Sequence, residues 1–320
     1  MMVAEQSNIT TPVLRIKDLI VEYRIGVRKS VRAVAGVSFD IPTGRVLALI
    51  GESGSGKSTI ARAICGLGPV TSGSITFAGS ALTGSSNPAS AAGTAGIQIV
   101  FQDSTAALDP RWPIWRSIIE PRIARMPENA AELKNRAVAL LGRVGLRAEL
   151  AERRPSQLSG GQRQRVTIAR ALASEPKMIV LDEPVSALDV SVRNEILLLL
   201  DRLRREEGLT YLFVSHDMGA VAQLADEIAV LYLGRIVEHG EARRVISHPA
   251  HPYTKALIAA VPSLGPKRAD TTPRGEIGDP ANPPPGCRFH PRCPVAIEEC
   301  RSIVPELKMY DGRLAACLRL

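Results

Sequence analysis

The stretch GESGSGKS, residues 51–58, lies between the apolar run VLALI and the segment STIARAICGL, whose apolar residues recur at helical spacing. A short apolar run that ends in glycine predicts a buried strand, and the spacing after it predicts a helix. Glycines at such a turn let backbone N–H groups point inward around a phosphate, whose negative charge the helix N-terminus favours. The stretch therefore predicts an α/β fold with a phosphate-binding loop; the alternative is a glycine-rich turn without a ligand.

The loop fits the pattern G-x-x-x-x-G-K-S/T of nucleotide-binding proteins. Its lysine, Lys57, is expected to reach the β- and γ-phosphates, and the hydroxyl of Ser58 is expected to bind Mg²⁺. The predicted nucleotide contacts of this loop are Gly51, Ser53, Gly54, Ser55, Gly56, Lys57, Ser58 and Thr59.

A second buried strand, KMIVLDE at 177–183, ends in two acids. A nucleotide site of this class needs an acid at the end of a neighbouring strand to hold Mg²⁺, and Asp182 suits that role. Glu183 is placed to orient and polarise an attacking water, which makes it the predicted catalytic base. The alternative is an ordinary pair of helix-capping acids.

The rest of the first 250 residues continues the α/β pattern. YLFVSHD at 211–217 predicts a third buried strand, and EIAVLYLGRIVEHG predicts a hairpin around Gly234. Strands that alternate with helices predict a parallel sheet. The early segments LRIKDLIVEYRI and AVAGVSFDIP alternate apolar and polar residues, which predicts an antiparallel flank. Helical periodicity dominates about residues 103–174, so we expect a helical subdomain there.

Net charge and composition exclude fewer classes of protein than the motifs do. The net charge of +8 is compatible with nucleic-acid binding, with an anionic membrane surface or with simple solubility. The N-terminal MMVAEQSNITT lacks the regions of a signal peptide, and no apolar run approaches the roughly 20 residues that cross a bilayer. We therefore expect a cytoplasmic protein, in which disulfides are disfavoured.

A third motif is LSGGQ, within QLSGGQRQRVTIARALA at 157–173, where Ser159 could also simply cap a helix. Together with the phosphate-binding loop and the strand ending in Asp-Glu, it resembles the ATPase subunits of ABC transporters over about residues 13–262. The resemblance implies a RecA-like parallel sheet with an antiparallel flank and a helical subdomain. It divides the chain into an ATPase domain at 1–250 and a C-terminal extension at 251–320.

Smaller elements match the same family. Gln102 in VFQD resembles the Q-loop, expected to contact Mg²⁺, and Asp189 in SALD resembles the D-loop. His216 in VSHD resembles the switch histidine, expected to hold the γ-phosphate. Tyr23 lies where an aromatic ring stacks on adenine, although half-buried packing is the alternative.

The resemblance implies a mechanism in which two ATPase subunits meet head to tail. Each ATP would then lie between one phosphate-binding loop and the partner's LSGGQ motif. ATP binding would close the dimer, and hydrolysis would open it again. The expected catalytic residues are Lys57, Glu183 and His216, and the residues expected to serve the partner's nucleotide are Ser159, Gly160, Gly161 and Gln162.

The stretch HPYTKALIAAVP, 251–262, resembles the element that follows the cassette in oligopeptide and dipeptide importers. This implies two membrane-spanning permease subunits, a second ABC ATPase subunit and an extracytoplasmic substrate-binding protein as partners. It also implies a peripheral place on the cytoplasmic face of the inner membrane and no nucleic-acid partner. Relatives in this group also carry nickel or glutathione. The alternative is a soluble ABC ATPase that acts on nucleic acid.

Beyond a Pro-rich segment that begins near residue 262, four cysteines follow the spacing C-x5-C-x6-C-x16-C. Four thiolates suit Zn²⁺ or an iron–sulfur cluster, with His290 as a possible alternative ligand. Two disulfides or four buried free thiols are the other interpretations. The resemblance implies a 4Fe–4S cluster, with zinc as the alternative, held by Cys287, Cys293, Cys300 and Cys317.

Overall fold

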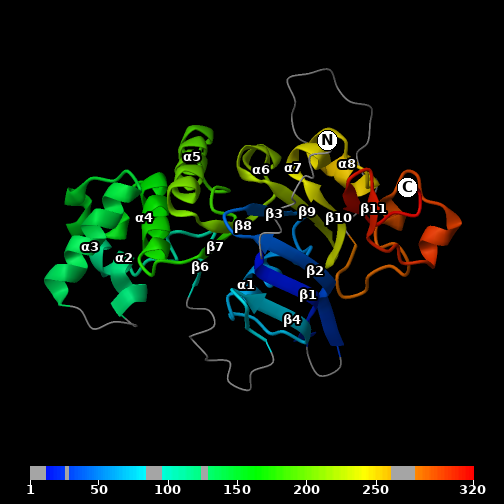
Figure 1. Cartoon of the computed structure of the whole chain (residues 1–320), viewed down its shortest axis with the longest axis horizontal. Coiled ribbons are helices and arrows are strands. Elements are labelled where there is room, and N and C mark those ends of the chain that lie inside the picture. The colour runs from blue at the N-terminus through cyan, green and yellow to red at the C-terminus, as the bar shows by residue number, and fades with distance from the viewer. Residues whose placement is uncertain (1–11, 26–28, 84–95, 124–128, 261–277) are drawn as a thin grey trace, which may run out of the picture.

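The structure of the chain is a computed structural model, and it describes residues 12–25, 29–83, 96–123, 129–260 and 278–320. Residues 262–277 of the Pro-rich segment therefore lie outside the described part. A helical lobe occupies one end of the molecule and the C-terminal extension the other, with two sheets between them (Figure 1). In the part of the chain that is described, no helix is both long and apolar enough to cross a membrane.

The centre of the molecule is the predicted parallel sheet. Its five strands run parallel in the order β9-β3-β8-β7-β6, as part of an eight-stranded sheet. All residues of β3, β7 and β8 are buried, as expected of strands covered on both faces. The strands are β3 (Val46–Ile50), β6 (Ile97–Val100), β7 (Met178–Asp182), β8 (Thr210–Ser215) and β9 (Glu227–Tyr232).

Alternate side chains of these strands enter two separate cores, because successive residues of a strand point to opposite faces. Val46, Ala48 and Ile50 of β3 belong to one core, whereas Leu47 and Leu49 belong to the other. This explains why the strands have continuous apolar runs rather than the alternation of a half-exposed strand.

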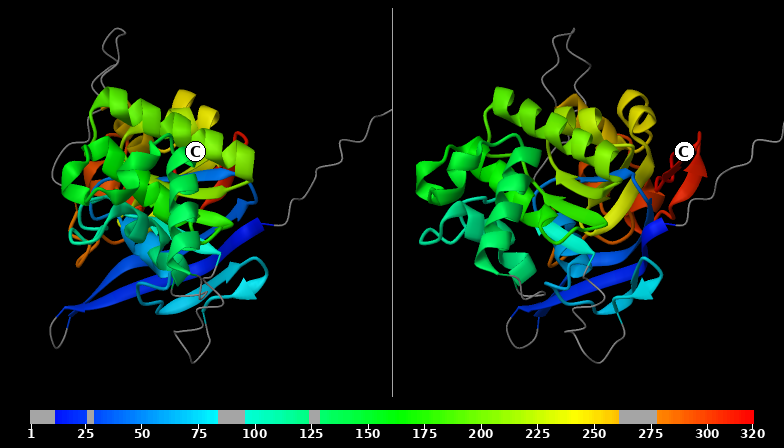
Figure 2. Two further views of the ribbon diagram at one scale, coloured as in Figure 1. Left: turned by 90° about the vertical axis from the view of Figure 1, so that its left-hand side faces the viewer. Right: turned by 60° about the vertical axis from the view of Figure 1, so that its left-hand side comes forward.

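The predicted antiparallel flank covers one face, with helix α1 (Lys57–Ile64) packed into the same core (Figure 2). Its strand order is β2-β1-β4-β5. The four strands are β1 (Pro12–Ile25), β2 (Lys29–Pro42), β4 (Ser72–Phe77) and β5 (Ser80–Ala81).

Helices cover the other face. They are α5 (Val190–Glu207), α6 (Met218–Leu224), α7 (Ala242–Ser247) and α8 (Pro252–Ala259). The helical lobe predicted at 103–174 contributes to the same core, and its α3 begins after Asn129, whose side chain accepts a hydrogen bond from the N–H of Glu132. The lobe consists of α2 (Ile114–Ile123), α3 (Ala130–Arg143), η1 (Ala148–Glu152), η2 (Pro155–Gln157) and α4 (Gly160–Leu172).

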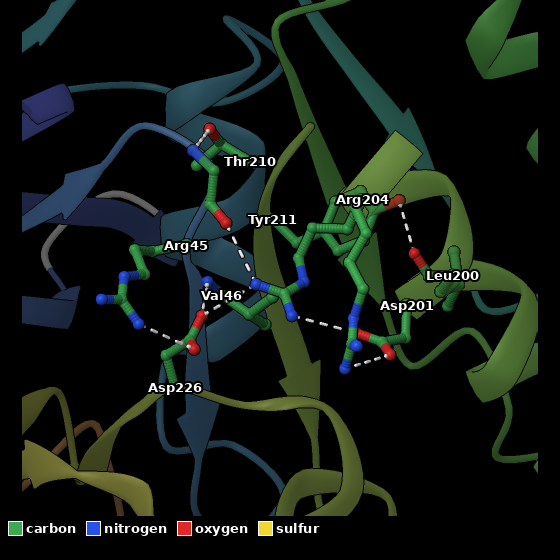
Figure 3. Close-up of polar contacts among 10 residues, drawn as sticks. Arg45, Val46, Leu200, Asp201, Arg204, Thr210, Tyr211 and Asp226 are labelled. Carbon is green, nitrogen blue, oxygen red and sulfur yellow. Dashed lines mark hydrogen bonds and ion pairs between the residues drawn. The ribbon is translucent and has the colours of Figure 1, made fainter. Parts of the chain in front are cut away.

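A polar network fastens the amino ends of the parallel strands to one another and to α5 (Figure 3). Asp226, just before β9, accepts hydrogen bonds from the N–H of Val46 (2.8 Å) and from Arg45 (3.1 Å). Arg204 of α5 donates to the carbonyl of Gly44 (3.1 Å) and reaches Asp226. The amino edge of the sheet is thus held by side chains, and the carboxyl edge is left for the loops that carry the chemistry.

The predicted hairpin around Gly234 is confirmed, with β10 (Arg235–Glu241) antiparallel to β9 and a positive φ of 80° at Gly234. The C-terminal extension continues the sheet from this hairpin. It contains η3 (His290–Arg292), η4 (Glu298–Arg301), β11 (Lys308–Tyr310) and β12 (Arg313–Ala315), and β12 pairs with β10. The Pro-rich segment therefore separates the cysteine tail from the cassette in sequence but not in space.

A buried carboxylate ties this junction together. Glu238 of β10 is completely buried and accepts hydrogen bonds from the N–H groups of Ala250 and His251, both at 2.8 Å. Arg313 of β12, also buried, forms an ion pair with Glu238 at 3.1 Å. Removing either partner would leave a buried charge without compensation, which destabilises a fold strongly.

The histidine of the HPYT stretch also has a structural role. His251 is 1% exposed, and its Nδ1 accepts a hydrogen bond from the N–H of Tyr253 (3.0 Å), which caps α8. Burial, with a smaller contribution from Lys255, lowers the pKa of His251 to about 3. The folded chain therefore requires the neutral imidazole.

Because the unfolded chain binds this proton near pH 6.5 and the folded chain does not, His251 makes stability fall as the pH decreases from about 6.5 toward 3. His251→Asn keeps a capping acceptor but has no group that titrates in this range. When the pH falls from 7.5 to 5, we expect the free energy of unfolding to decrease by about 2 kcal/mol less in this variant than in the parent. Urea unfolding at both pH values measures the difference. Equal pH dependence in the two proteins would contradict a buried neutral histidine.

Candidate active site

The predicted catalytic residues Lys57, Glu183 and His216 meet at the carboxyl edge of the parallel sheet. The phosphate-binding loop follows β3, Asp182 ends β7 with Glu183 after it, and His216 follows β8. Since β3, β8 and β7 are neighbours in that order, the three loops lie side by side. Open α/β sheets bind their ligands at this edge.

Two glycines of the loop are required by contact with the rest of the fold. A Cβ on Gly51 would lie 2.1 Å from the carbonyl oxygen of Leu231, and one on Gly56 would lie 2.4 Å from that of Ala33. Both glycines also have positive φ, 151° and 108°, which L side chains rarely adopt. The loop is therefore pressed directly onto the backbone of β9 and β2.

Lys57 lies over this loop. It is 6% exposed, and its Nζ donates hydrogen bonds to the carbonyls of Gly51 (2.8 Å) and Glu52 (2.9 Å). Burial lowers the pKa of Lys57, while the acids nearby, Glu183 and Asp182 foremost, oppose this shift. A cation held between the loop and two carboxylates is well placed to contact a phosphate at the loop.

Ser58 and Asp182 provide two oxygen atoms that suit Mg²⁺. The hydroxyl of Ser58 donates to Oδ1 of Asp182 at 3.0 Å. Burial raises the pKa of Asp182, and the hydrogen bond from Ser58 opposes this effect. Mg²⁺ prefers such hard oxygen ligands and takes its remaining ones from phosphates and water, so these residues fit the expected ion.

Glu183 and His216 face each other at the same edge. Oε1 of Glu183 lies 3.2 Å from Nδ1 of His216, and the N–H of Glu183 donates to the carbonyl of Val214 at 2.9 Å. Glu183 has a φ of 51°, a left-handed conformation that is costly for a residue with a side chain. Its backbone hydrogen bond to β8 holds it in this conformation.

The LSGGQ motif begins helix α4. Ser159 caps the helix by accepting from the N–H of Gln162 (3.3 Å), whose side chain accepts from the N–H of Ser159 (3.0 Å). A Cβ on Gly161 would lie 2.5 Å from Val192 of α5, so this glycine permits close packing beside the segment of Asp189, which precedes α5. The motif belongs to the helical lobe, whereas α1 lies on the other side of the sheet (Figure 1).

Two predicted nucleotide contacts are less constrained. Gln102 is exposed and lies two residues beyond the end of β6, at the same edge as Asp182. Tyr23 is half-buried on β1 and packs against the core beside α1.

Sequence reasoning missed the surroundings of Glu52, the second residue of the phosphate-binding loop. Its N–H donates to the hydroxyl of Tyr253 (2.8 Å), and its carboxylate accepts from both terminal nitrogens of Arg292 (2.8 and 3.0 Å). The sequence could have indicated this contact, because Glu52 is an acid inside a loop predicted to bind negative phosphates. A cation near Glu52 is expected in such a loop.

The predicted metal centre of the extension is not supported. All five cysteines are free thiols. Burial raises the pKa of Cys287 to about 11, with smaller contributions from Cys300, Cys293 and Cys317. Within the described ranges, however, no three or more histidine, cysteine or acidic side chains form a group that could hold a metal ion. His290 instead lies 2.9 Å, through Nδ1, from the carbonyl of Cys287.

Comparison with known proteins identifies the family. The family described as ABC transporter matches residues 34–186, and the one described as oligopeptide/dipeptide transporter, C-terminal region, matches residues 237–300. The dipeptide transport ATP-binding protein DppF of Haemophilus influenzae is 44% identical over 91% of this chain and 90% of its own. The chain belongs to the ATP-binding subunits of oligopeptide and dipeptide ABC transporters.

Further relatives agree with this membership. The oligopeptide transport ATP-binding protein OppF of Escherichia coli is 42% identical over 91% of this chain and 89% of its own. Among solved structures, the ATP-binding cassette MJ0796, a dimer bound to ADP and Pi, has a TM-score of 0.65 at 30% identity and covers 72% of this chain and 99% of its own. The predicted fold class is confirmed, and this ABC chain is an ATPase.

Proposed function

We propose that this chain hydrolyses ATP to power an importer of peptides, of the oligopeptide or dipeptide class. The observation that carries the proposal is that Lys57, Glu183 and His216 lie at one edge of the sheet in a chain whose extension is matched at residues 237–300. The dipeptide and oligopeptide relatives, similar over about nine-tenths of the chain, support the same substrate class. The comparisons lend no support to the alternative of a soluble ATPase acting on nucleic acid.

In this proposal the phosphates of ATP lie on the loop of residues 51–58. Backbone N–H groups and the Lys57 ammonium there stabilise the negative charge of the phosphates. Mg²⁺ neutralises the phosphates and orients them when bound, with Ser58, Asp182 and Gln102 as its protein contacts. Tyr23 would stack on the adenine, because it lies on β1 beside the core that contains α1.

Glu183 is the proposed base that takes a proton from the attacking water. His216 contacts its carboxylate and would hold the γ-phosphate. The left-handed backbone of Glu183, held by β8, fixes the carboxylate in one direction and reduces the reorganisation needed for reaction.

A second ATPase subunit completes the site. Ser159, Gly160, Gly161 and Gln162 begin α4 in a lobe away from α1, so we propose that they serve the nucleotide of the partner. Asp189 is exposed and directly precedes α5, whose Val192 packs against Gly161. Two permease subunits would bind the helical lobe, and a substrate-binding protein would deliver the peptide outside. The chain would then lie peripherally on the cytoplasmic face of the membrane.

Replacing the base separates binding from hydrolysis. We expect Glu183→Gln to bind Mg–ATP with an affinity within about threefold of the parent, but to lower steady-state turnover by about 10²–10⁴-fold, the usual contribution of a general base. Phosphate release and nucleotide titration measure the two effects. Glu206→Gln, an exposed acid of α5, is the control and should behave as the parent. Retention of substantial turnover by Glu183→Gln would refute the assignment.

Uptake measurements test the substrate class. In the organism that encodes this chain, deletion of its gene should abolish uptake of labelled di- or oligopeptides, since transport needs ATP hydrolysis. The parent gene should restore uptake, and Glu183→Gln should not. Unchanged peptide uptake, with loss of nickel or glutathione uptake instead, would show that the substrate class is wrong.

The 4Fe–4S cluster, or zinc as its alternative, rests on the resemblance alone. The test is iron, sulfide and zinc analysis of anaerobically purified protein, with its visible absorption spectrum. About four iron and four sulfide per chain with visible absorption would establish the cluster. Colourless protein without iron, sulfide or zinc would contradict both the cluster and the zinc site.

A further inference from the structure

The N–H, the carbonyl and the carboxylate of Glu52 each form a hydrogen bond. Residues beyond position 250 contact two of these three groups. Its carbonyl accepts from Lys57 (2.9 Å), as expected within a phosphate-binding loop. Its N–H donates to Tyr253 of α8 (2.8 Å), and its carboxylate forms a bidentate ion pair with Arg292 of η3. The C-terminal extension therefore contacts the loop that binds the phosphates.

These two residues are held rigidly. Tyr253 is 1% exposed and Arg292 is 9% exposed. The ring of Tyr253 packs against Tyr232 of β9 and Phe289 of the extension, with centroids 4.6 and 5.4 Å away. The guanidinium of Arg292 lies 5.9 Å from the centroids of both Tyr232 and Phe289. Packing of this kind fixes side-chain rotamers and favours the cation above the ring faces.

Charge gives this contact a consequence for nucleotide binding. A carboxylate within the loop opposes the approach of the negatively charged phosphates. Glu52 is also close enough to Lys57 to oppose, with Glu183 and Asp182, the lowering of the Lys57 pKa by burial. Arg292 compensates that carboxylate. Because the side chain of Glu52 is only 23% exposed, solvent screens the pair less than a pair on the open surface.

We propose that Arg292 and Tyr253 are positioning residues for ATP binding: Arg292 neutralises and fixes Glu52, and Tyr253 fixes the N–H of the same residue. Neither residue has to touch the nucleotide. The folded C-terminal extension thereby sets the affinity of the phosphate-binding loop, and a change in the extension that displaces η3 weakens nucleotide binding.

The test uses the full-length chain and ADP, which contacts the loop through its β-phosphate and needs no second subunit. We expect Arg292→Gln to weaken ADP binding about tenfold, in the range measured when one partner of a partly buried ion pair is removed. Adding Glu52→Gln should return the affinity to within about threefold of the parent, because the uncompensated carboxylate is then absent. Calorimetric titration measures all three proteins.

The matched control is Arg301→Gln. Arg301 lies in the same extension but pairs with Glu298 at an exposed site, 69% and 82% exposed, so its loss should leave ADP binding within about twofold of the parent. If Arg292→Gln behaves like this control, or if Glu52→Gln does not restore its affinity, the proposal is overturned.

Steady-state kinetics separate positioning from general damage to the fold. A displaced loop weakens ground-state and transition-state binding alike, so Arg292→Gln should raise KM for ATP about tenfold with kcat within about twofold. A loss of kcat at unchanged KM would show a structural role instead and contradict the proposal.

Tyr253→Phe keeps the ring packing but removes the acceptor of the Glu52 N–H, so it should raise KM for ATP about threefold. An unchanged KM would exclude Tyr253 from this role.

Discussion

The backbone of the phosphate-binding loop can present its N–H groups to a ligand only if it keeps one shape, and the rest of the structure maintains that shape. Gly51 and Gly56 lie directly against the carbonyls of Leu231 and Ala33. The N–H of Gly234 donates to the carbonyl of Ser55 at 2.8 Å, so the β9–β10 hairpin supports the loop from a second side. Tyr253 and Arg292 hold Glu52 from a third.

Sheet topology assembles the chemistry around this loop. Neighbouring strands β3, β8 and β7 end at one edge and bring Lys57, His216 and the pair Asp182 and Glu183 together. Burial lowers the pKa of Lys57, and the nearby acids Glu183, Asp182 and Glu52 oppose this shift. Mg–ATP would add both a cation and an anion to this group of charges.

Local patterns predicted most of the fold, because each pattern lies within a few residues of its structure. The loop at 51–58, the strand ending at Asp182 and the turn at Gly234 are of this kind. The ion pair between Arg292 and Glu52 joins residues 240 positions apart, and no local pattern contains it. The pairing of β12 with β10 was missed for the same reason. Cysteine spacing predicted a metal centre, but spacing does not determine how thiols are oriented after the extension folds.

Because Tyr253 and Arg292 contact Glu52, we infer that the phosphate-binding loop and the C-terminal extension respond to nucleotide together. Amide hydrogen exchange of the full-length chain with and without Mg–ADP measures this coupling, since exchange reports local opening at each segment. Coupled segments should show slower exchange both at residues 51–58 and at residues 287–293, which surround the Arg292 contact. Slower exchange at the loop with no change in the extension would contradict it.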